Sequence, residues 1–207
     1  MLIIKNVIFD IGRVLLKYEP LEYLNTRFDT EKANGLMDLV FKSKEWSDSD
    51  QGLLDFGALY DTLSKKNQEW AEDLHQLLNR EWLLSIMSPK QDTVDFMYEL
   101  KANGYKIYLL SNFSEEGFSW MDEKYPFLSD VDGRIISSHV KLIKPDHEIY
   151  KLLLNQYALE PAESVFIDDT AVNVQAAIEL GINAILFTDI ASCRQQFELL
   201  IQSPLNA

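Results

Sequence analysis

The 207-residue sequence contains little cysteine and little histidine, and this scarcity excludes two common kinds of site. Cys193 is its only cysteine, so the sequence offers neither an internal disulfide nor a multi-cysteine zinc site. The three histidines, His75, His139 and His147, do not have the spacing of a metal-binding motif. We therefore expect Cys193 to be an ordinary thiol on a C-terminal helix.

Basic residues are also scarce, because 19 lysines and arginines oppose 33 aspartates and glutamates, for a formal net charge of −14. The phosphates of DNA, RNA and anionic membranes repel a protein of this charge, since binding them depends on lysine and arginine. No long apolar run lies near the start, because Lys5, Asn6, Asp10 and Arg13 interrupt the apolar residues of segment 1–16. The sequence thus predicts a soluble cytoplasmic protein without nucleic-acid or membrane partners.

Hydrophobic residues make up 47% of the chain, and their periodicity changes along it. Residues 3–10 form a short apolar run that ends in Asp10 and predicts a buried strand. From residue 20 to about residue 84 the apolar residues recur at helical spacing without a convincing strand, which predicts four or five short helices. After residue 88, predicted helices and strands alternate, an order typical of a parallel sheet covered on both faces.

The helical block interrupts this alternation after the first strand, so it has the position of an insertion. The predicted fold is therefore α/β: a Rossmann-like parallel-sheet core with an inserted all-helical cap. We assign residues 1–17 and 87–207 to the core domain and residues 18–86 to the cap domain.

Polar residues end three of the predicted strands, at the edge where open parallel sheets bind ligands. These are Asp10, Ser111 and the pair Asp168 and Asp169, while Lys144 lies in a loop before a helix. Carboxylates brought together need a cation or a raised pKa, and their oxygens suit Mg²⁺. A hydroxyl and a lysine at the same point would complete a phosphate site, in which a carboxylate nucleophile could form an aspartyl-phosphate.

Four segments also carry a family resemblance. Residues 7–15 (VIFDIGRVL), 109–112 (LLSN), 143–146 (IKPD) and 165–169 (VFIDD) resemble, in this order, the four motifs of the haloacid dehalogenase (HAD) superfamily. The resemblance covers essentially the whole chain, including a helical cap inserted after the first strand. The most similar subgroup has an Asp-x-Gly first motif and includes bacterial sugar-1-phosphate phosphatases, so the resemblance implies a HAD-like core and a hydrolase.

The resemblance also implies a role for each motif residue. Asp10 resembles the nucleophile that also binds Mg²⁺, and Asp169 resembles the principal Mg²⁺ ligand of the last motif. Ser111 resembles the hydroxyl that hydrogen-bonds the transferred phosphoryl group, with Asn112 beside it. Lys144 resembles the lysine that offsets negative charge between nucleophile and phosphate.

Three further positions complete the implied site. Asp168 matches a direct or water-mediated partner of the metal, and Gly12 matches the position whose backbone carbonyl binds it. Arg13, next to Gly12, either contacts the phosphate or forms a surface ion pair.

Gly12 is also where the sequence departs from the common pattern. Most superfamily phosphatases have a second aspartate at this position, which protonates the leaving oxygen and then deprotonates the attacking water. Glycine does neither, and losing a general acid–base residue typically costs ~10²–10⁴-fold in rate. One interpretation is a Mg²⁺-dependent phosphatase of a small phosphorylated metabolite, such as a sugar phosphate, helped by water, the cap or the substrate. The others are a 2-haloacid dehalogenase and a catalytically weak relative kept for binding or regulation.

We favour the phosphatase. Dehalogenases of this superfamily lack Mg²⁺ and normally have an aromatic residue at the position of Gly12, and they would leave the acidic pair Asp168 and Asp169 harder to explain. Phosphomutase chemistry needs the missing carboxylate. Response-regulator receivers combine similar residues, but they are shorter and their acidic pair precedes the phosphoacceptor. We expect the protein to act as a monomer or a homodimer.

Overall fold

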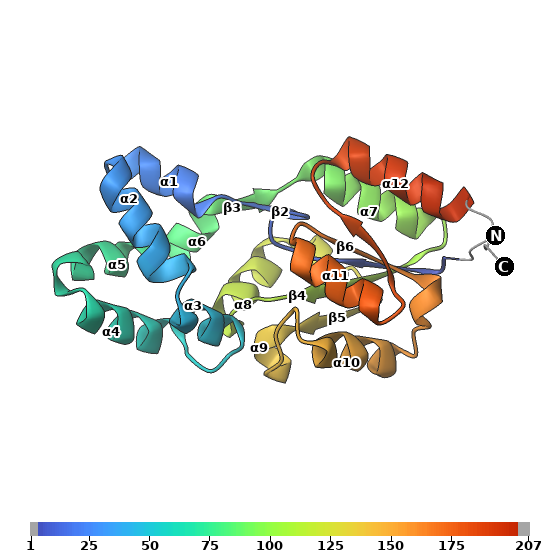
Figure 1. The fold of residues 1–207 in the computed structure, drawn as a ribbon. Coiled ribbons are helices and arrows are strands. Elements are labelled where there is room, and N and C mark those ends of the chain that lie inside the picture. The colour runs from blue at the N-terminus through green and yellow to red at the C-terminus, as the bar shows by residue number, and fades with distance from the viewer. Residues whose placement is uncertain (1–3, 203–207) are drawn as a thin grey trace.

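The computed structural model describes residues 4–202, and its centre is a five-stranded parallel sheet with the order β5-β4-β1-β6-β7 (Figure 1). The central strand β1 pairs with β4 and β6, so that Ile8 lies opposite Tyr108 and Phe166. The predicted α/β fold with a parallel sheet is therefore confirmed. The strands are β1 (Asn6–Phe9), β4 (Lys106–Ser111), β5 (Gly133–Ile136), β6 (Ser164–Asp168) and β7 (Asn183–Leu186).

Helices cover both faces of the sheet, because successive strand residues point to opposite sides. Val7 and Phe9 of β1 belong to one apolar cluster, together with residues of α7, α8 and α12, whereas Ile8 belongs to a second cluster with residues of α10 and α11. This explains why β1 is a continuous apolar run rather than an alternating one. The core helices are α7 (Gln91–Ala102), α8 (Glu115–Lys124), η3 (Pro126–Leu128), α9 (Ser137–Val140), α10 (His147–Tyr157), η4 (Pro161–Glu163), α11 (Ala171–Glu179) and α12 (Ile190–Gln202).

The chain between β2 (Leu16–Tyr18) and β3 (Met87–Pro89) is helical, as predicted, and Figure 1 shows its helices grouped apart from those that cover the sheet. It contains more helices than expected, because α3 (sequence KEWSDSD) has Trp46 as its one apolar residue and therefore shows no helical periodicity. The elements are α1 (Pro20–Arg27), α2 (Thr30–Leu36), the π-helical turn η1 (Met37–Phe41), α3 (Lys44–Asp50), α4 (Phe56–Lys66), η2 (Gln68–Trp70), α5 (Ala71–Leu77) and α6 (Arg80–Ile86).

β2 and β3 pair as a short antiparallel ribbon, through which the chain enters and leaves this helical block. The predicted domain boundaries lie within β2 and at the first residue of β3, and the division into two domains stays a prediction. The block contacts the core beyond the ribbon: the side chain of Gln51 donates to the carbonyl of Lys141 at 2.8 Å. The backbone N–H of Phe56 donates to the carboxylate of Glu116 at 2.6 Å. The segment between α3 and α4 is thus held against the core.

Cys193 lies buried on α12, where burial raises the pKa of its thiol to about 12. A thiol of this kind stays protonated at neutral pH and is unreactive. Within residues 4–202, none of the helices is both long enough and apolar enough to cross a membrane.

Candidate active site

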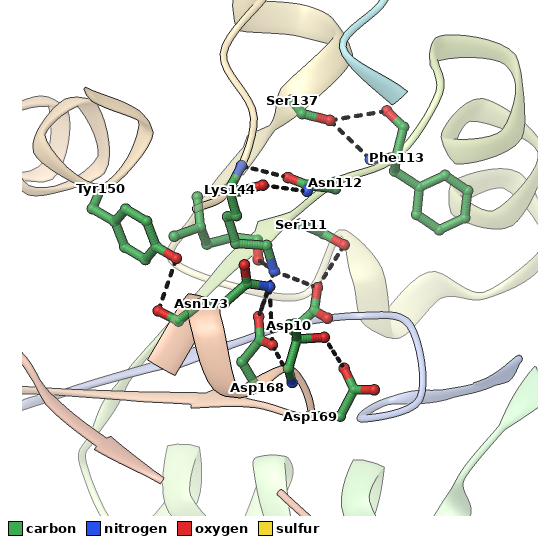
Figure 2. A network of polar contacts seen from close by, with 12 residues as sticks. Asp10, Ser111, Asn112, Phe113, Ser137, Lys144, Tyr150, Asp168, Asp169 and Asn173 are labelled. Atoms are coloured by element: carbon green, nitrogen blue, oxygen red, sulfur yellow. Dashed lines mark hydrogen bonds and ion pairs between the residues drawn. The ribbon is translucent and has the colours of Figure 1, made fainter. Parts of the chain in front are cut away.

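Three adjacent strands bring the predicted site residues together. Asp10 directly follows β1, Ser111 ends β4 and Asp168 ends β6, and parallel pairing aligns these strand ends at one edge of the sheet. Figure 2 shows the carboxylates of Asp10 and Asp168 directed toward Lys144 and the hydroxyl of Ser111 directed toward Asp10. Residues that are far apart in the sequence therefore form one site at the carboxyl edge, where α/β sheets place their ligands.

Lys144 is the buried cation of this site. Its Nζ atom lies 2.9 Å from Oδ1 of Asp10 and 2.7 Å from Oδ2 of Asp168, and it also donates to the carbonyl of Leu110 at 2.9 Å. Burial lowers the pKa of this ammonium group, but the charges of Asp10 and Asp168 outweigh burial and leave the pKa raised. Lys144 therefore remains charged beside Asp10.

Asp10 is buried between a cation and a hydroxyl. The hydroxyl of Ser111 donates to Oδ1 of Asp10 at 2.7 Å, the same oxygen that Lys144 contacts. Burial raises the pKa of Asp10 to about 6, with Lys144 acting to lower it and Asp168 acting to raise it. At neutral pH the carboxylate form predominates, so Asp10 can act as an anionic nucleophile.

The third carboxylate group belongs to Asp169. Ligand atoms of Asp10, Asp168 and Asp169 all lie within 4.8 Å of one another. Burial raises the pKa of Asp169, the charge of Asp168 raises it further, and Arg13 lowers it. Within the described residues, this carboxylate-only oxygen set fits Mg²⁺, which binds through a few carboxylates and keeps positions for water and phosphate.

Asp168 is held more tightly than Asp169. Its carboxylate accepts from the backbone N–H of Thr170 at 2.8 Å and from the side-chain amide of Asn173 at 3.1 Å, besides its ion pair with Lys144. The hydroxyl of the buried Tyr150 in turn donates to the backbone carbonyl of Asn173 at 3.0 Å. Asp168 thus positions Lys144, and the Asp168 carboxylate stays beside those of Asp10 and Asp169.

Asn112 holds the loop that carries Lys144. Its side-chain amide donates to the backbone carbonyl of Lys144 at 3.0 Å and accepts from the backbone N–H of the same residue at 2.8 Å. The side chain that was expected near the phosphate therefore positions the lysine, and its contact with phosphate stays a prediction.

Gly12 and Arg13 form a turn that lines a cavity together with Asp10 and Asp169. Arg13 has a φ of 59°, and its guanidinium lies 3.7 Å from Oδ2 of Asp169 and donates to the carbonyl of Tyr18 at 3.2 Å. Of its two expected roles, the ion pair is present, and the contact with phosphate stays a prediction. A Cβ atom on Gly12 would meet nothing within 4 Å, so lack of space does not explain the glycine.

Asp50 of α3 lies at the candidate site, although no pattern in the sequence predicts it there. It lines the same cavity of about 60 Å³ as Gly12. Burial raises the pKa of its carboxyl to about 7, with the charge of Asp10 adding to the rise. In the sequence, Asp50 belongs to the acidic segment Ser47–Asp50, which is typical of a solvated helix surface.

Most of the chain matches a known family of hydrolases. Residues 4–181 match the haloacid dehalogenase-like hydrolase family, and the chain belongs to this family. It is 26% identical over 201 residues to the sesquiterpene phosphatase astK of Aspergillus oryzae, covering 95% of this chain and 96% of that protein. It is 23% identical over 218 residues to the D-ribitol-5-phosphate phosphatase of Bacteroides thetaiotaomicron, covering 97% of this chain and 100% of that protein.

Solved structures show the same fold. A predicted HAD-like hydrolase from Porphyromonas gingivalis superposes with a TM-score of 0.72 at 18% identity, over 98% of this chain and 100% of that chain. A HAD family enzyme from Bacteroides thetaiotaomicron, in complex with magnesium and inorganic phosphate, gives 0.69 at 22% identity, over 89% and 94%. The predicted superfamily is confirmed, and the predicted enzyme class agrees with the two phosphatase relatives.

Proposed function

We propose that the protein is a Mg²⁺-dependent phosphatase that hydrolyses a small phosphorylated metabolite through an aspartyl-phosphate on Asp10. The observation that carries this proposal is that one buried carboxylate oxygen lies 2.7 Å from the hydroxyl of Ser111 and 2.9 Å from the ammonium of Lys144. The relatives that act on phosphate esters support the substrate class. The related enzyme in complex with magnesium and phosphate supports the metal.

In the first step, a carboxylate oxygen of Asp10 attacks phosphorus, the phosphorus–oxygen bond of the ester breaks, and the alcohol leaves. The hydroxyl of Ser111 then donates to a phosphoryl oxygen instead of to Asp10. Lys144 offsets the negative charge that nucleophile and phosphate bring together. Fixed charges and donors of this kind supply most of the rate acceleration in phosphoryl transfer.

The acidic cluster is the proposed metal site. Asp10, Asp169 and the backbone carbonyl of Gly12 would hold Mg²⁺, with Asp168 as a direct or water-mediated partner. Mg²⁺ bound there would supply positive charge to the phosphoryl oxygens. The net negative charge of the three carboxylates and Lys144 agrees with a requirement for this cation.

The helical block closes the site and selects the leaving group. A cavity of about 250 Å³ is lined by Asp10 and Asp169 on the core side and by Met37, Phe41 and Trp46 on the block side. These apolar side chains exclude bulk water from the phosphoenzyme, which water must then hydrolyse in a controlled step. A sugar phosphate is one candidate substrate, and the lining also admits a less polar alcohol. We expect this reaction in the cytoplasm, catalysed by a monomer or a homodimer.

A screen of phosphorylated metabolites tests the proposal, with Asp10→Asn as the control. The set includes polyol, sugar and isoprenoid phosphates, each assayed with Mg²⁺ and with EDTA. The proposal expects phosphate release that requires both Mg²⁺ and Asp10. Release of chloride from 2-chloropropionate without metal would identify a dehalogenase instead. A complete lack of product and of a fluoride-trapped complex on Asp10 would leave only a binding or regulatory role.

A further inference from the structure

We propose that Asp50, contributed by the helical block, is the general acid and base of this reaction and fills the role that Gly12 cannot. The assignment rests on the proposed phosphatase function. It accounts for a proposed site with a nucleophile, a lysine and a metal cluster, in which Gly12 stands where most related phosphatases have their acid–base aspartate.

The first support is the shape of the site. Two cavities share Gly12, Tyr18 and Trp46 as lining residues; the larger, of about 250 Å³, is also lined by Asp10, and the smaller, of about 60 Å³, by Asp50. A Cβ atom on Gly12 would meet nothing within 4 Å, so glycine leaves the space between nucleophile and Asp50 open. A phosphate ester on Asp10 would therefore have its leaving group on the side of Asp50.

The second support is the way in which the core holds Asp50. The hydroxyl of Ser137 donates to the backbone carbonyl of Asp50, and the side chain of the neighbouring Gln51 donates to a core carbonyl at 2.8 Å. The carboxyl itself interacts with the backbone N–H of Ser114 and the side chain of Trp46. Asp50 is thus fixed between the block and the core, as a group that acts on a bound ester must be.

The third support is an unsatisfied donor beside it. The hydroxyl oxygen of Tyr18 is buried, and among residues 4–202 it has no hydrogen-bond partner. Burial and then the charge of Asp50 raise the pKa of Tyr18, so this hydroxyl remains a donor. A buried hydroxyl without a protein partner is free to donate to an ordered water or to an oxygen of a bound ligand.

The raised pKa of Asp50 allows its carboxyl group to act as an acid in the first step and as a base in the second. Burial is the main cause that raises its pKa to about 7, Asp10 adds to the rise, and the interactions with Ser114 and Trp46 oppose it. Among residues 4–202, the ionisable groups that interact with it are Asp10 after β1 and Tyr18 of β2. A general acid–base group is most effective when its pKa lies near the working pH.

The proton and electron balance is as follows. While Asp10 attacks phosphorus, the bond between phosphorus and the ester oxygen breaks, its electron pair stays on that oxygen, and the carboxyl proton of Asp50 neutralises it as an alcohol. The Asp50 carboxylate then takes a proton from water as the water oxygen attacks the phosphorus of the aspartyl-phosphate. The bond to Asp10 breaks, its electron pair returns to the Asp10 carboxylate, and inorganic phosphate leaves.

Leaving groups of similar size and different basicity test this assignment in the Mg²⁺-loaded protein. We would measure kcat/KM for p-nitrophenyl, phenyl and benzyl phosphate with wild type, Asp50→Asn and Asp48→Asn. Asp48 is the matched control, because it lies on the same helix and pairs with Lys44. Circular dichroism checks that each variant is folded.

A general acid matters most when the leaving oxygen is basic. Asp50→Asn should therefore lower kcat/KM for benzyl phosphate by ~10²–10⁴-fold and for p-nitrophenyl phosphate far less, while Asp48→Asn changes neither. Equal losses for all three esters, or no loss, would overturn the role of Asp50 and leave the phosphatase function standing. If wild type releases phosphate from none of these esters and from no metabolite in the screen, the proposed function fails, and this assignment fails with it.

Discussion

The ammonium nitrogen of Lys144 lies 2.9 Å from Oδ1 of Asp10, and both residues are buried. The same nitrogen lies 2.7 Å from Asp168, so one cation serves two carboxylates inside the protein. Burying charges is costly unless they are paired. We therefore expect the ion pairs of Lys144 to contribute both to the stability of the core and to the proposed reaction.

Replacing Lys144 should reduce both the stability of the core and the catalytic activity. Lys144→Met leaves the carboxylates of Asp10 and Asp168 without their partner, so the free energy of unfolding should fall by about 3–5 kcal/mol in EDTA. Urea unfolding measures the loss, and Lys106→Met, at an exposed lysine paired with Asp132, is the control that should cost less than about 1 kcal/mol. Mg²⁺ should raise the Tm of Lys144→Met more than that of wild type. Equal stability losses in the two variants would contradict the structural role of Lys144.

Asp10→Asn should abolish phosphate release and keep the fold. An amide of the same shape cannot attack phosphorus, whereas Lys144 keeps Asp168 as its partner. A phosphate-release assay measures activity, and circular dichroism measures the fold. Turnover at the wild-type rate would refute the assignment of the nucleophile.

Mg²⁺ should stabilise the wild-type protein through the acidic cluster. A ligand at 100 times its Kd stabilises a folded protein by about 2.7 kcal/mol, which a thermal melt detects. Asp169→Asn should remove most of this shift, because it removes one of the three clustered carboxylates. Asp38→Asn, at an exposed residue of the helical block, should leave the shift unchanged. An undiminished shift in Asp169→Asn would place the metal elsewhere.

Gly52 should be required for the contact between the helical block and the core. Its φ is +73°, and a Cβ atom there would lie 2.5 Å from the carbonyl oxygen of Ser138. Gly104 has a φ of +92°, but a Cβ atom there would meet nothing within 4 Å. Both alanine variants should lose roughly 1–2 kcal/mol from backbone strain. Only Gly52→Ala should also lower kcat/KM, by up to ~10²-fold, because it displaces the segment next to Asp50.

The stability of Asp50→Asn relative to wild type should depend on pH. The folded-state pKa of Asp50, about 7, lies above the ordinary value of 3.8, so the folded protein binds this proton more tightly than the unfolded chain does. The resulting stabilisation is complete below pH 3.8 and is lost as the pH rises through 7. Asp50→Asn should therefore gain stability over wild type between pH 4.5 and 8, by roughly 1–3 kcal/mol.

Thermal melts in EDTA across this range measure the difference. Asp48→Asn is the matched control, since Asp48 lies on the same helix and its carboxylate pairs with Lys44. A pH-independent difference for Asp50→Asn would show that Asp50 is not titrating in the folded protein.

The core of the site could be predicted because its residues sit where local patterns are strong. Asp10, Ser111 and Asp168 each lie at the end of a buried apolar strand. Parallel pairing brings these ends to one edge of the sheet, however the connecting helices are arranged. The helical insertion could also be predicted, because most of its helices repeat apolar residues at helical spacing. The number of its helices could not be predicted, because α3 buries little apolar surface and therefore shows no helical periodicity.

By itself, the sequence determined the parallel sheet, the inserted helical block and the residues at the strand ends, because local periodicity and chain order encode them. Only the tertiary structure decided that Asn112 holds the Lys144 loop and that Asp50 and Gly12 line one small cavity. Both facts depend on contacts between distant segments, such as Ser137 with the backbone of Asp50, for which sequence spacing carries no signal. The carboxyl group that we propose as the proton donor therefore reaches the cavity beside Gly12 only when the block is folded against the core.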